Sequence, residues 1–148
     1  MPPTLIDTNL LVYLYDRNQP GKQNQSQRVL EQLELTRNGR LSVQTLAEFF
    51  SVATRKLSPR LTPAEALEQV NLFIRLFPVF DLTPMIVMEA GRGVGDHKLS
   101  YFDAQVWATA RLNQVPVVFS EDFRDGSILE GVRFVNPFSS EFSLEKWL

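Results

Sequence analysis

The protein has 148 residues, of which 44% are hydrophobic and 22% are charged, and its formal net charge at pH 7 is −2. This length and balance are typical of one globular domain, in which about 68–70% of the unfolded surface can be buried. With no cysteine and one histidine, the sequence excludes a disulfide framework, a thiolate metal site and a multi-histidine zinc centre.

The sequence also argues against a membrane protein. No apolar run approaches the roughly 18–20 residues that a membrane-spanning helix needs, and no signal peptide is visible. The slightly negative charge does not favour nucleic-acid binding by itself, although divalent cations bound to carboxylates can attract phosphates locally. We therefore expect a single cytoplasmic domain over residues 1–148, without internal repeats or linkers.

The chain begins with a short apolar run, Thr4–Ile6, which ends abruptly in Asp7. This pattern predicts a buried parallel strand that is followed by a short helix from Asn9 to about Tyr15, capped by Thr8 or Asn9. Ligands of open α/β sheets bind at the C-terminal ends of the strands. Asp7 is therefore the first candidate functional residue, and we expect it to be one of several acids around a metal ion.

The second candidate acid, Glu48, lies in a helix predicted over 45–56. Before this helix, the sequence predicts a turn at Pro20-Gly21, a helix over about 25–37 ended by Asn38-Gly39, and a very short strand at 41–43. In the helix over 45–56, Leu46, Phe49, Phe50 and Ala53 follow helical spacing and define the buried face. Glu48 lies on roughly the opposite side, and this pattern alone favours a solvated surface glutamate.

In the middle of the chain, the sequence predicts helices and a strand but no further candidate functional residue. Thr62, Pro63 and Glu65 form the capping pattern of a helix that runs to about Phe77, and a strand follows over 79–82. Thr83-Pro84 starts another helix in the same way. We interpret Gly91, Gly93 and Gly95 as the close of that helix and a loop, because phosphate-binding glycines open a helix instead.

A helix predicted over about 100–113 contains the third candidate acid, Asp103. Ser100 and Asp103 suit a capping box, which would be a purely structural role. The helical wheel, however, places Asp103 between Val106, Trp107 and Ala110, inside the apolar arc. A carboxylate directed toward the core is costly unless it is paired or bound to a cation, so the functional interpretation is favoured.

The strand predicted at 115–119 repeats the pattern of the first strand, because it ends in Ser120-Glu121-Asp122. A turn at Asp125-Gly126, a last strand at 132–135 and a short helix in the tail complete the prediction. The alternation of strands and helices predicts an α/β fold: a three-layer sandwich with a central parallel sheet of about five short strands flanked by helices.

This topology gathers acids from distant segments at one edge of the sheet. Carboxylates packed together raise one another's pKa unless a cation neutralises them, and Mg²⁺ prefers oxygen ligands. A bound divalent ion can activate water for attack on phosphorus and stabilise the charge that develops on the phosphate oxygens.

Taken together, the motifs resemble the PIN-domain ribonucleases, and within them the VapC-type toxins of type II toxin–antitoxin pairs. The segments that carry this resemblance are Leu5-Ile6-Asp7-Thr8-Asn9, Gln44-Thr45-Leu46-Ala47-Glu48-Phe49-Phe50, Leu99-Ser100-Tyr101-Phe102-Asp103-Ala104, Ser120-Glu121-Asp122-Phe123-Arg124-Asp125-Gly126 and Val132-Arg133-Phe134-Val135-Asn136-Pro137-Phe138. Each segment is weak alone, but their order and spacing are fairly specific.

The resemblance implies RNA cleavage that depends on Mg²⁺ or Mn²⁺, with an acidic quartet of Asp7, Glu48, Asp103 and Asp122. Our mechanistic hypothesis is that Asp7, Asp103 and Asp122 hold the metal while Glu48, turned toward the cleft, orients or deprotonates the attacking water. Thr8 and Asn9 would hold the Asp7 loop, and Ser120 stands where the family usually has threonine. Candidates for contacts with RNA phosphates are Arg17, Arg55, Lys98 and Arg124, for which ordinary solvated charges are an equal alternative.

The resemblance also implies partners, namely an RNA substrate, an antitoxin whose tail fills an apolar groove and covers the acids, and a second copy in a homodimer. Three alternatives stay open. A haloacid dehalogenase-type phosphatase needs a second aspartate where this chain has Asn9. A PIN nuclease in RNA maturation without an antitoxin fits the acids equally well, and a catalytically degenerate RNA- or protein-binding module is the non-enzyme alternative.

Overall fold

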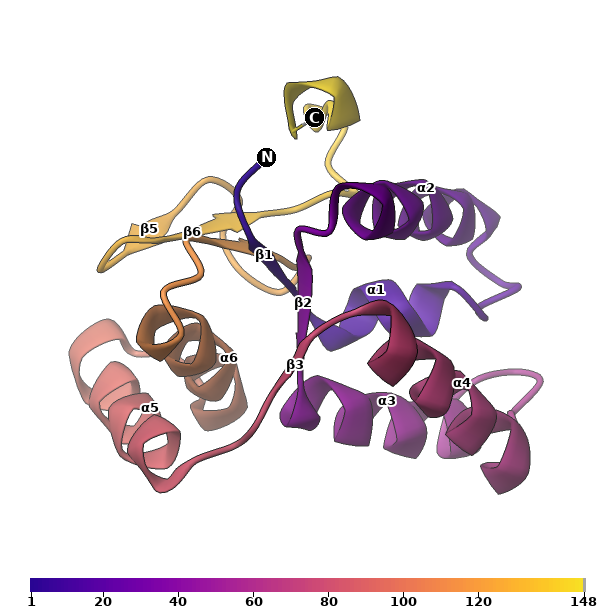
Figure 1. Ribbon diagram of the computed structural model, residues 1–148, viewed down its shortest axis with the longest axis horizontal. Helices are drawn as coiled ribbons and strands as arrows, with labels where there is room; N and C mark the ends of the chain where they lie inside the picture. Colours follow the sequence, from indigo (N-terminus) through magenta and orange to yellow (C-terminus); the bar gives the residue numbers. More distant parts are fainter. Residues whose placement is uncertain (148) are drawn as a thin grey trace.

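The computed structural model describes residues 1–147 and places one sheet between two groups of helices (Figure 1). The six strands lie in the order β3-β2-β1-β4-β6-β5. Their bounds are β1 Thr4–Ile6, β2 Gly39–Ser42, β3 Val79–Phe80, β4 Val117–Phe119, β5 Ile128–Leu129 and β6 Val132–Val135. All neighbouring strands are parallel except β5, which pairs with β6 in an antiparallel hairpin. The predicted α/β sandwich is confirmed, with β5 as an additional edge strand that makes the sheet mixed.

The helices cover both faces of the sheet. Their bounds are α1 Thr8–Tyr13, α2 Pro20–Thr36, α3 Val43–Arg55, α4 Pro63–Leu76, α5 Pro84–His97, α6 Tyr101–Leu112 and a final 3₁₀ helix Leu144–Trp147. Helices α1 to α4 lie on one side of β1–β3, and α5 and α6 pair on the other (Figure 1). None of the helices within residues 1–147 is both long and apolar enough to cross a membrane.

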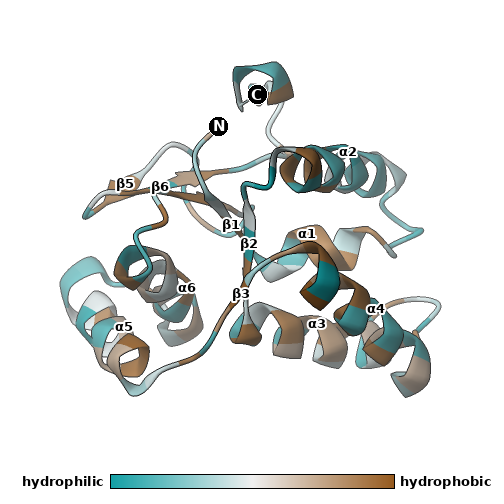
Figure 2. Cartoon of the chain, viewed as in Figure 1, coloured by the Kyte–Doolittle hydropathy of each residue, from teal (hydrophilic) through white to brown (hydrophobic). Residues whose placement is uncertain are grey.

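Two hydrophobic cores result, and the strands supply both. Ile6 and Phe119 pack into the core beneath α1 to α4, whereas their neighbours Leu5 and Val118 pack into the core beneath α5 and α6. Successive side chains of a strand point to opposite faces, so a strand that is buried on both faces must be apolar throughout. The short apolar runs at β1 and β4 are therefore central strands. Hydrophobic residues also lie along β5 and β6, whereas much of α2 is hydrophilic (Figure 2).

Helix α2 starts and stops at different residues from those predicted. Pro20 is not part of a turn but lies at the start of the helix, where its missing N–H costs nothing and its φ angle suits the helix. The helix ends at Thr36, where Arg37 adopts the left-handed conformation with φ 58°, and Asn38-Gly39 already lead into β2.

Helix α5 also differs from its prediction, because it runs through all three glycines to His97. Gly93 is buried against α6, and a Cβ at this position would lie 2.8 Å from Cζ3 of Trp107. The glycine here permits close helix packing and does not end the helix. The predicted capping box is confirmed at α4, where Thr62 and Glu65 bond reciprocally.

Candidate active site

The register of the central strands brings the first two candidate residues together. β1 pairs with β4 so that Ile6 lies opposite Phe119, and the next residue of each strand is Asp7 and Ser120. The Asp7 N–H donates to the Phe119 carbonyl oxygen at 3.0 Å, and the Ser120 hydroxyl donates to Asp7 Oδ2 at 2.7 Å. The C-terminal ends of β1 and β4, which are far apart in the sequence, thus meet at one edge of the sheet. The polar residues that follow each strand predicted this.

Asp7 itself is the N-cap of α1. Its Oδ1 accepts a hydrogen bond from the Thr8 N–H at 2.8 Å, so the prediction that Thr8 or Asn9 caps this helix is wrong. The helix begins one residue earlier than expected, which leaves the Thr8 and Asn9 side chains free to contact other site residues. The Asn9 side-chain amide donates to Ser120 Oγ at 3.3 Å and to Asp122 Oδ2 at 3.2 Å.

Ser120 connects three of these groups. Its buried hydroxyl donates to Asp7 and accepts from both the Asn9 amide and the Asp122 main-chain N–H, the latter at 3.1 Å. One hydroxyl therefore orients the acid at the end of β1 and the acid in the loop after β4.

Glu48 joins the site through α1. Its carboxylate accepts a hydrogen bond from the Thr8 hydroxyl at 2.9 Å and another from the Gln44 amide at 2.8 Å. Glu48 thus faces α1 and not bulk solvent, because β2 lies beside β1 and brings α3 against α1. The orientation implied by the family resemblance matches the structure, and the solvated position favoured by the helix pattern alone does not.

Asp103 lies in the first turn of α6, at the rim of the site. It is half-buried and does not point fully into the core, and within residues 1–147 its carboxylate makes no hydrogen bond. Ser100 occupies the N-cap position without a side-chain capping bond, so the capping box also does not form. The negative charge of Asp103 nevertheless contributes to raising the pKa of Asp122.

Burial and crowding disfavour ionisation of these acids. Desolvation raises the pKa of Asp7 to about 7, helped by the charges of Asp122 and Glu48 and opposed by the hydrogen bonds from Ser120 and Thr8. Desolvation also raises the pKa of Asp122, and neighbouring acids add to the shift. A cation at this position would relieve both effects.

The donor set suits a hard divalent ion. Carboxylate oxygens predominate, and Asn9 Oδ1 is buried without a hydrogen-bond partner in the described chain. Within residues 1–147, no three acidic or histidine side chains are already spaced as metal ligands. Mg²⁺ typically binds one or two carboxylates directly and keeps several waters, so it needs no preformed three-ligand group.

The four predicted phosphate-contact residues do not join this network. Arg17, Arg55, Lys98 and Arg124 are exposed, and Arg55 bonds to Ser51 on its own helix at 2.8 Å. Their exposure agrees equally with solvated charges and with contacts to a ligand.

A cluster around Glu121, which no sequence pattern predicts, anchors the loop after β4. Glu121, next to Asp122, bonds to the Tyr13 hydroxyl and to Lys22 Nζ, the latter at 2.9 Å. The ammonium group also lies 4.8 Å from the Tyr13 ring centroid. These contacts join the loop after β4 to α1 and α2, and no local pattern could have indicated them because the partners are about a hundred residues apart.

Comparisons with known proteins agree with this architecture. The sequence matches the PIN domain family over residues 4–125. No curated protein matches the chain by sequence. A toxin–antitoxin complex from Klebsiella pneumoniae superposes with a TM-score of 0.66 at 20% identity, covering 91% of this chain and 98% of the other. DNA-bound VapBC from Salmonella typhimurium gives a TM-score of 0.67 at 20% identity, covering 93% and 99%.

A third similar structure is VapC20 of Mycobacterium tuberculosis, a toxin that cleaves the sarcin–ricin loop. It gives a TM-score of 0.66 at 17% identity, and the match covers 88% of this chain and 98% of VapC20. At these identities the structures establish a shared fold. The family match, in contrast, is made by sequence, and it spans most of the chain and includes all four candidate acids. This protein therefore belongs to the PIN domain family.

Proposed function

We propose that this PIN domain is a Mg²⁺- or Mn²⁺-dependent endoribonuclease that hydrolyses RNA phosphodiester bonds. The observation that supports this most strongly is the set of acids gathered by Ser120, Asn9 and Thr8, in which the buried Asp7 has a pKa of about 7. VapC20 has the same fold and cleaves the sarcin–ricin loop, an activity that is consistent with this proposal.

In this proposal Asp7, Asp103 and Asp122 hold the metal, directly or through water. When bound, the ion lowers the pKa of water and stabilises negative charge on the phosphate oxygens. Glu48 orients the attacking water and accepts its proton, and the Thr8 hydroxyl and Gln44 amide hold the Glu48 carboxylate in place. Ser120 and Asn9 hold Asp7 and Asp122 in fixed relation.

An RNA cleavage assay tests the enzyme proposal. The purified protein is incubated with tRNA and rRNA in Mg²⁺, Mn²⁺ or EDTA, alongside Asp7→Asn and the matched control Asp96→Asn. Asp96 is an exposed acid on α5 that pairs with Arg92 at 3.0 Å, outside the acidic site. We expect cleavage by the wild type and by the control in both metals, and none by Asp7→Asn or in EDTA. Full activity of Asp7→Asn, or cleavage in EDTA, contradicts the proposal.

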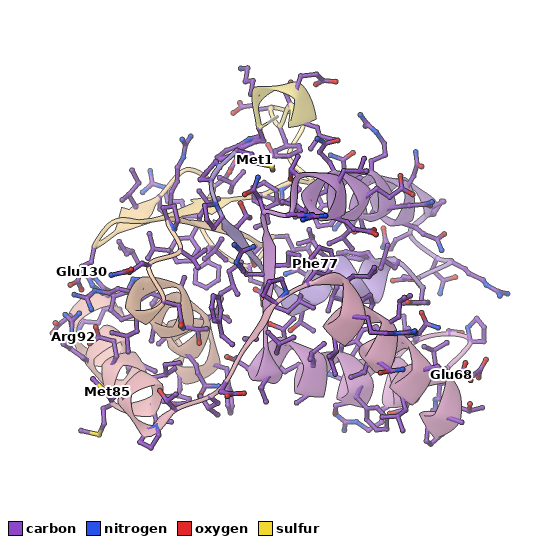
Figure 3. The ribbon with its side chains drawn as sticks, viewed as in Figure 1. Met1, Glu68, Phe77, Met85, Arg92 and Glu130 are labelled. Atoms are coloured by element: carbon purple, nitrogen blue, oxygen red, sulfur yellow. The ribbon has the colours of Figure 1, made fainter. Side chains whose placement is uncertain are left out.

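We further propose that the nuclease is the toxin of a type II toxin–antitoxin pair. Similar structures are described as toxin–antitoxin and VapBC complexes. This chain also exposes large apolar side chains along α4 and α5, among them Leu67, Ile74 and Met88, and Met85 extends outward from α5 (Figure 3). Such side chains are suited to a groove-filling antitoxin segment and to a homodimer contact.

Co-expression with the product of a neighbouring small open reading frame tests the partner. We expect a stable complex that suppresses RNA cleavage, and a light-scattering mass of the free protein near twice 16.9 kDa. An active nuclease that no such product inhibits would instead favour RNA maturation, and a folded chain that binds RNA without cleaving it would favour a degenerate binding module.

A further inference from the structure

Gln44 occupies a central position that the acidic residues alone do not explain. It lies on α3 one helical turn before Glu48, and its side chain is buried, with the residue only 8% exposed. Its amide nitrogen donates to Glu48 Oε1 at 2.8 Å and to the Phe102 carbonyl oxygen at 3.0 Å. One side chain thus joins a candidate catalytic acid on α3 to the first turn of α6.

This link matters because Asp103, unlike the other three candidate acids, lies outside the hydrogen-bond network that the structure describes within residues 1–147. Asp7, Asp122 and Glu48 are each held by hydrogen bonds from side chains or main-chain groups of the site, whereas the Asp103 carboxylate makes none within residues 1–147. Phe102 directly precedes Asp103 in the chain. The bond from Gln44 to the Phe102 carbonyl therefore sets where the Asp103 turn lies relative to Glu48.

The remaining polar atom of Gln44 shows that stability alone does not account for this side chain. Gln44 Oε1 is buried and has no hydrogen-bond partner in the described chain. An unsatisfied buried carbonyl opposes folding, and an apolar side chain of similar length would avoid it. Such unsatisfied groups are uncommon in native proteins and call for a specific reason. Here the reason is the pair of bonds that the amide nitrogen donates.

We propose that Gln44 is a positioning residue that holds Glu48 and Asp103 at the separation the metal site requires. The inference rests on the proposed metal-dependent function of these acids. Gln44 acts through its two donated hydrogen bonds and touches neither metal nor substrate. Groups that orient metal ligands in this way change metal affinity or activity about 10–100-fold when they are removed.

The test compares two substitutions at Gln44 with a matched glutamine elsewhere. Gln44→Met keeps the length and removes the donor, while Gln44→Glu keeps the shape and replaces the donor with a carboxylate oxygen that faces Glu48 and the Phe102 carbonyl oxygen. The control is Gln25→Met on α2, because the Gln25 amide likewise donates to a main-chain carbonyl, that of Pro137 at 2.8 Å, outside the acidic network. For each protein, Mn²⁺ affinity is measured by calorimetry, kcat and KM by RNA cleavage, and the thermal midpoint in EDTA.

We expect both Gln44 variants to lose about 10–100-fold in Mn²⁺ affinity and kcat, with KM for RNA within about threefold of the wild type. The thermal midpoint of Gln44→Met stays within about 3 °C of the wild type, because the lost hydrogen bonds are offset by removal of the unsatisfied carbonyl. Gln25→Met retains wild-type affinity and kcat.

Three results overturn the inference. One is wild-type Mn²⁺ affinity and kcat in Gln44→Met. Another is wild-type affinity and kcat in Gln44→Glu, which would show that the donated hydrogen bonds are not needed. The third is a fall of more than about 10 °C in the midpoint of both variants, which would show a structural role. A wild type that neither binds Mn²⁺ nor cleaves RNA contradicts the proposed function itself, and so is distinguishable from these.

Discussion

Among the individual residues of the site, Asp7 shows how strongly burial changes an acid. The residue is only 4% exposed and its carboxylate accepts hydrogen bonds from Ser120 and Thr8, yet desolvation still raises its pKa to about 7. The protonated form is therefore favoured in the folded protein relative to the unfolded chain, where the pKa is 3.8. This difference couples the protonation of Asp7 to the stability of the fold.

The substitution Asp7→Asn tests that coupling. A raised pKa in the folded state contributes stability below about pH 4, and this contribution is lost as the pH rises toward 7. We expect Asp7→Asn to be more stable than the metal-free wild type at pH 8, by on the order of 3–4 kcal/mol. The difference should vanish near pH 4. Urea unfolding in EDTA at pH 4, 6 and 8 measures it, and a difference that does not change with pH would refute the coupling.

Ser120 offers a second residue-level test, because another buried serine provides its control. The Ser120 hydroxyl bonds to Asp7, Asn9 and Asp122, whereas the Ser26 hydroxyl is equally buried and has no partner in the described chain. Ser120→Ala removes a hydrogen bond that lowers the pKa of Asp7, so the pKa rises further.

We therefore expect Ser120→Ala to bind Mn²⁺ about 10–100-fold more weakly and to need a higher pH for half-maximal binding. Ser26→Ala should keep the wild-type affinity and change the free energy of unfolding by less than about 1 kcal/mol. Calorimetric titrations from pH 6 to 9 distinguish the two serines. Equal affinities in all three proteins would mean that Ser120 does not orient the acids.

At the level of elements, the pairing of α5 with α6 depends on a glycine that the sequence pattern suggested was a helix end. Gly93 faces the Trp107 ring, and the Trp107 indole N–H donates to the Leu129 carbonyl oxygen at 3.1 Å. The ring thus connects α6 to the edge hairpin while α5 packs directly on it. A glycine inside a helix normally weakens it, and here the close approach compensates.

Alanine substitutions within α5 separate these two effects. At Gly93 an added Cβ lies 2.8 Å from the Trp107 ring, so we expect a loss of about 1–3 kcal/mol in the free energy of unfolding. At Gly95 a Cβ meets nothing within 4 Å, and alanine should stabilise by about 0.5–1 kcal/mol through helix propensity. Chemical denaturation of both variants measures the contrast. Two changes of the same sign would disprove the packing role of Gly93.

At the scale of the whole molecule, one cluster of ion pairs is centred on α5. Arg92 on α5 pairs with Glu130 at 2.9 Å, and its guanidinium lies 5.4 Å from the Trp107 ring centroid (Figure 3). His97 ends α5 and contacts Glu130 at 2.6 Å. These ion pairs connect α5 to the turn between β5 and β6, and because they are exposed to solvent each contributes little to stability.

The acidic site should instead make stability depend on metal. A ligand that binds only the folded state stabilises it by about 2.7 kcal/mol at a hundredfold excess over Kd. We expect Mg²⁺ or Mn²⁺ to raise the thermal midpoint of the wild type by several degrees, and to leave that of Asp7→Asn unchanged. Differential scanning calorimetry with and without EDTA checks this. An equal rise in both proteins would place the bound metal elsewhere.

The sequence by itself determined the α/β architecture and the position of Asp7 and the Asp122 loop at one edge of the sheet. Apolar runs bounded by polar residues identify central strands, because strands buried on both faces need such runs, and parallel strands place Asp7 and the loop of Asp122 at one edge. Local capping at Thr62 was equally readable, because its partners lie within one turn.

Only the tertiary structure decided how the other groups meet. A helical wheel shows on which side of its helix Glu48 or Asp103 lies. It does not show which other helix or strand packs against that side. That element depends on contacts between distant segments: Thr8 meets Glu48, Gln44 meets Phe102, and Glu121 meets Lys22. The physical reason is that the periodicity of a helix is local, whereas its rotation and neighbours are set by packing across the whole core.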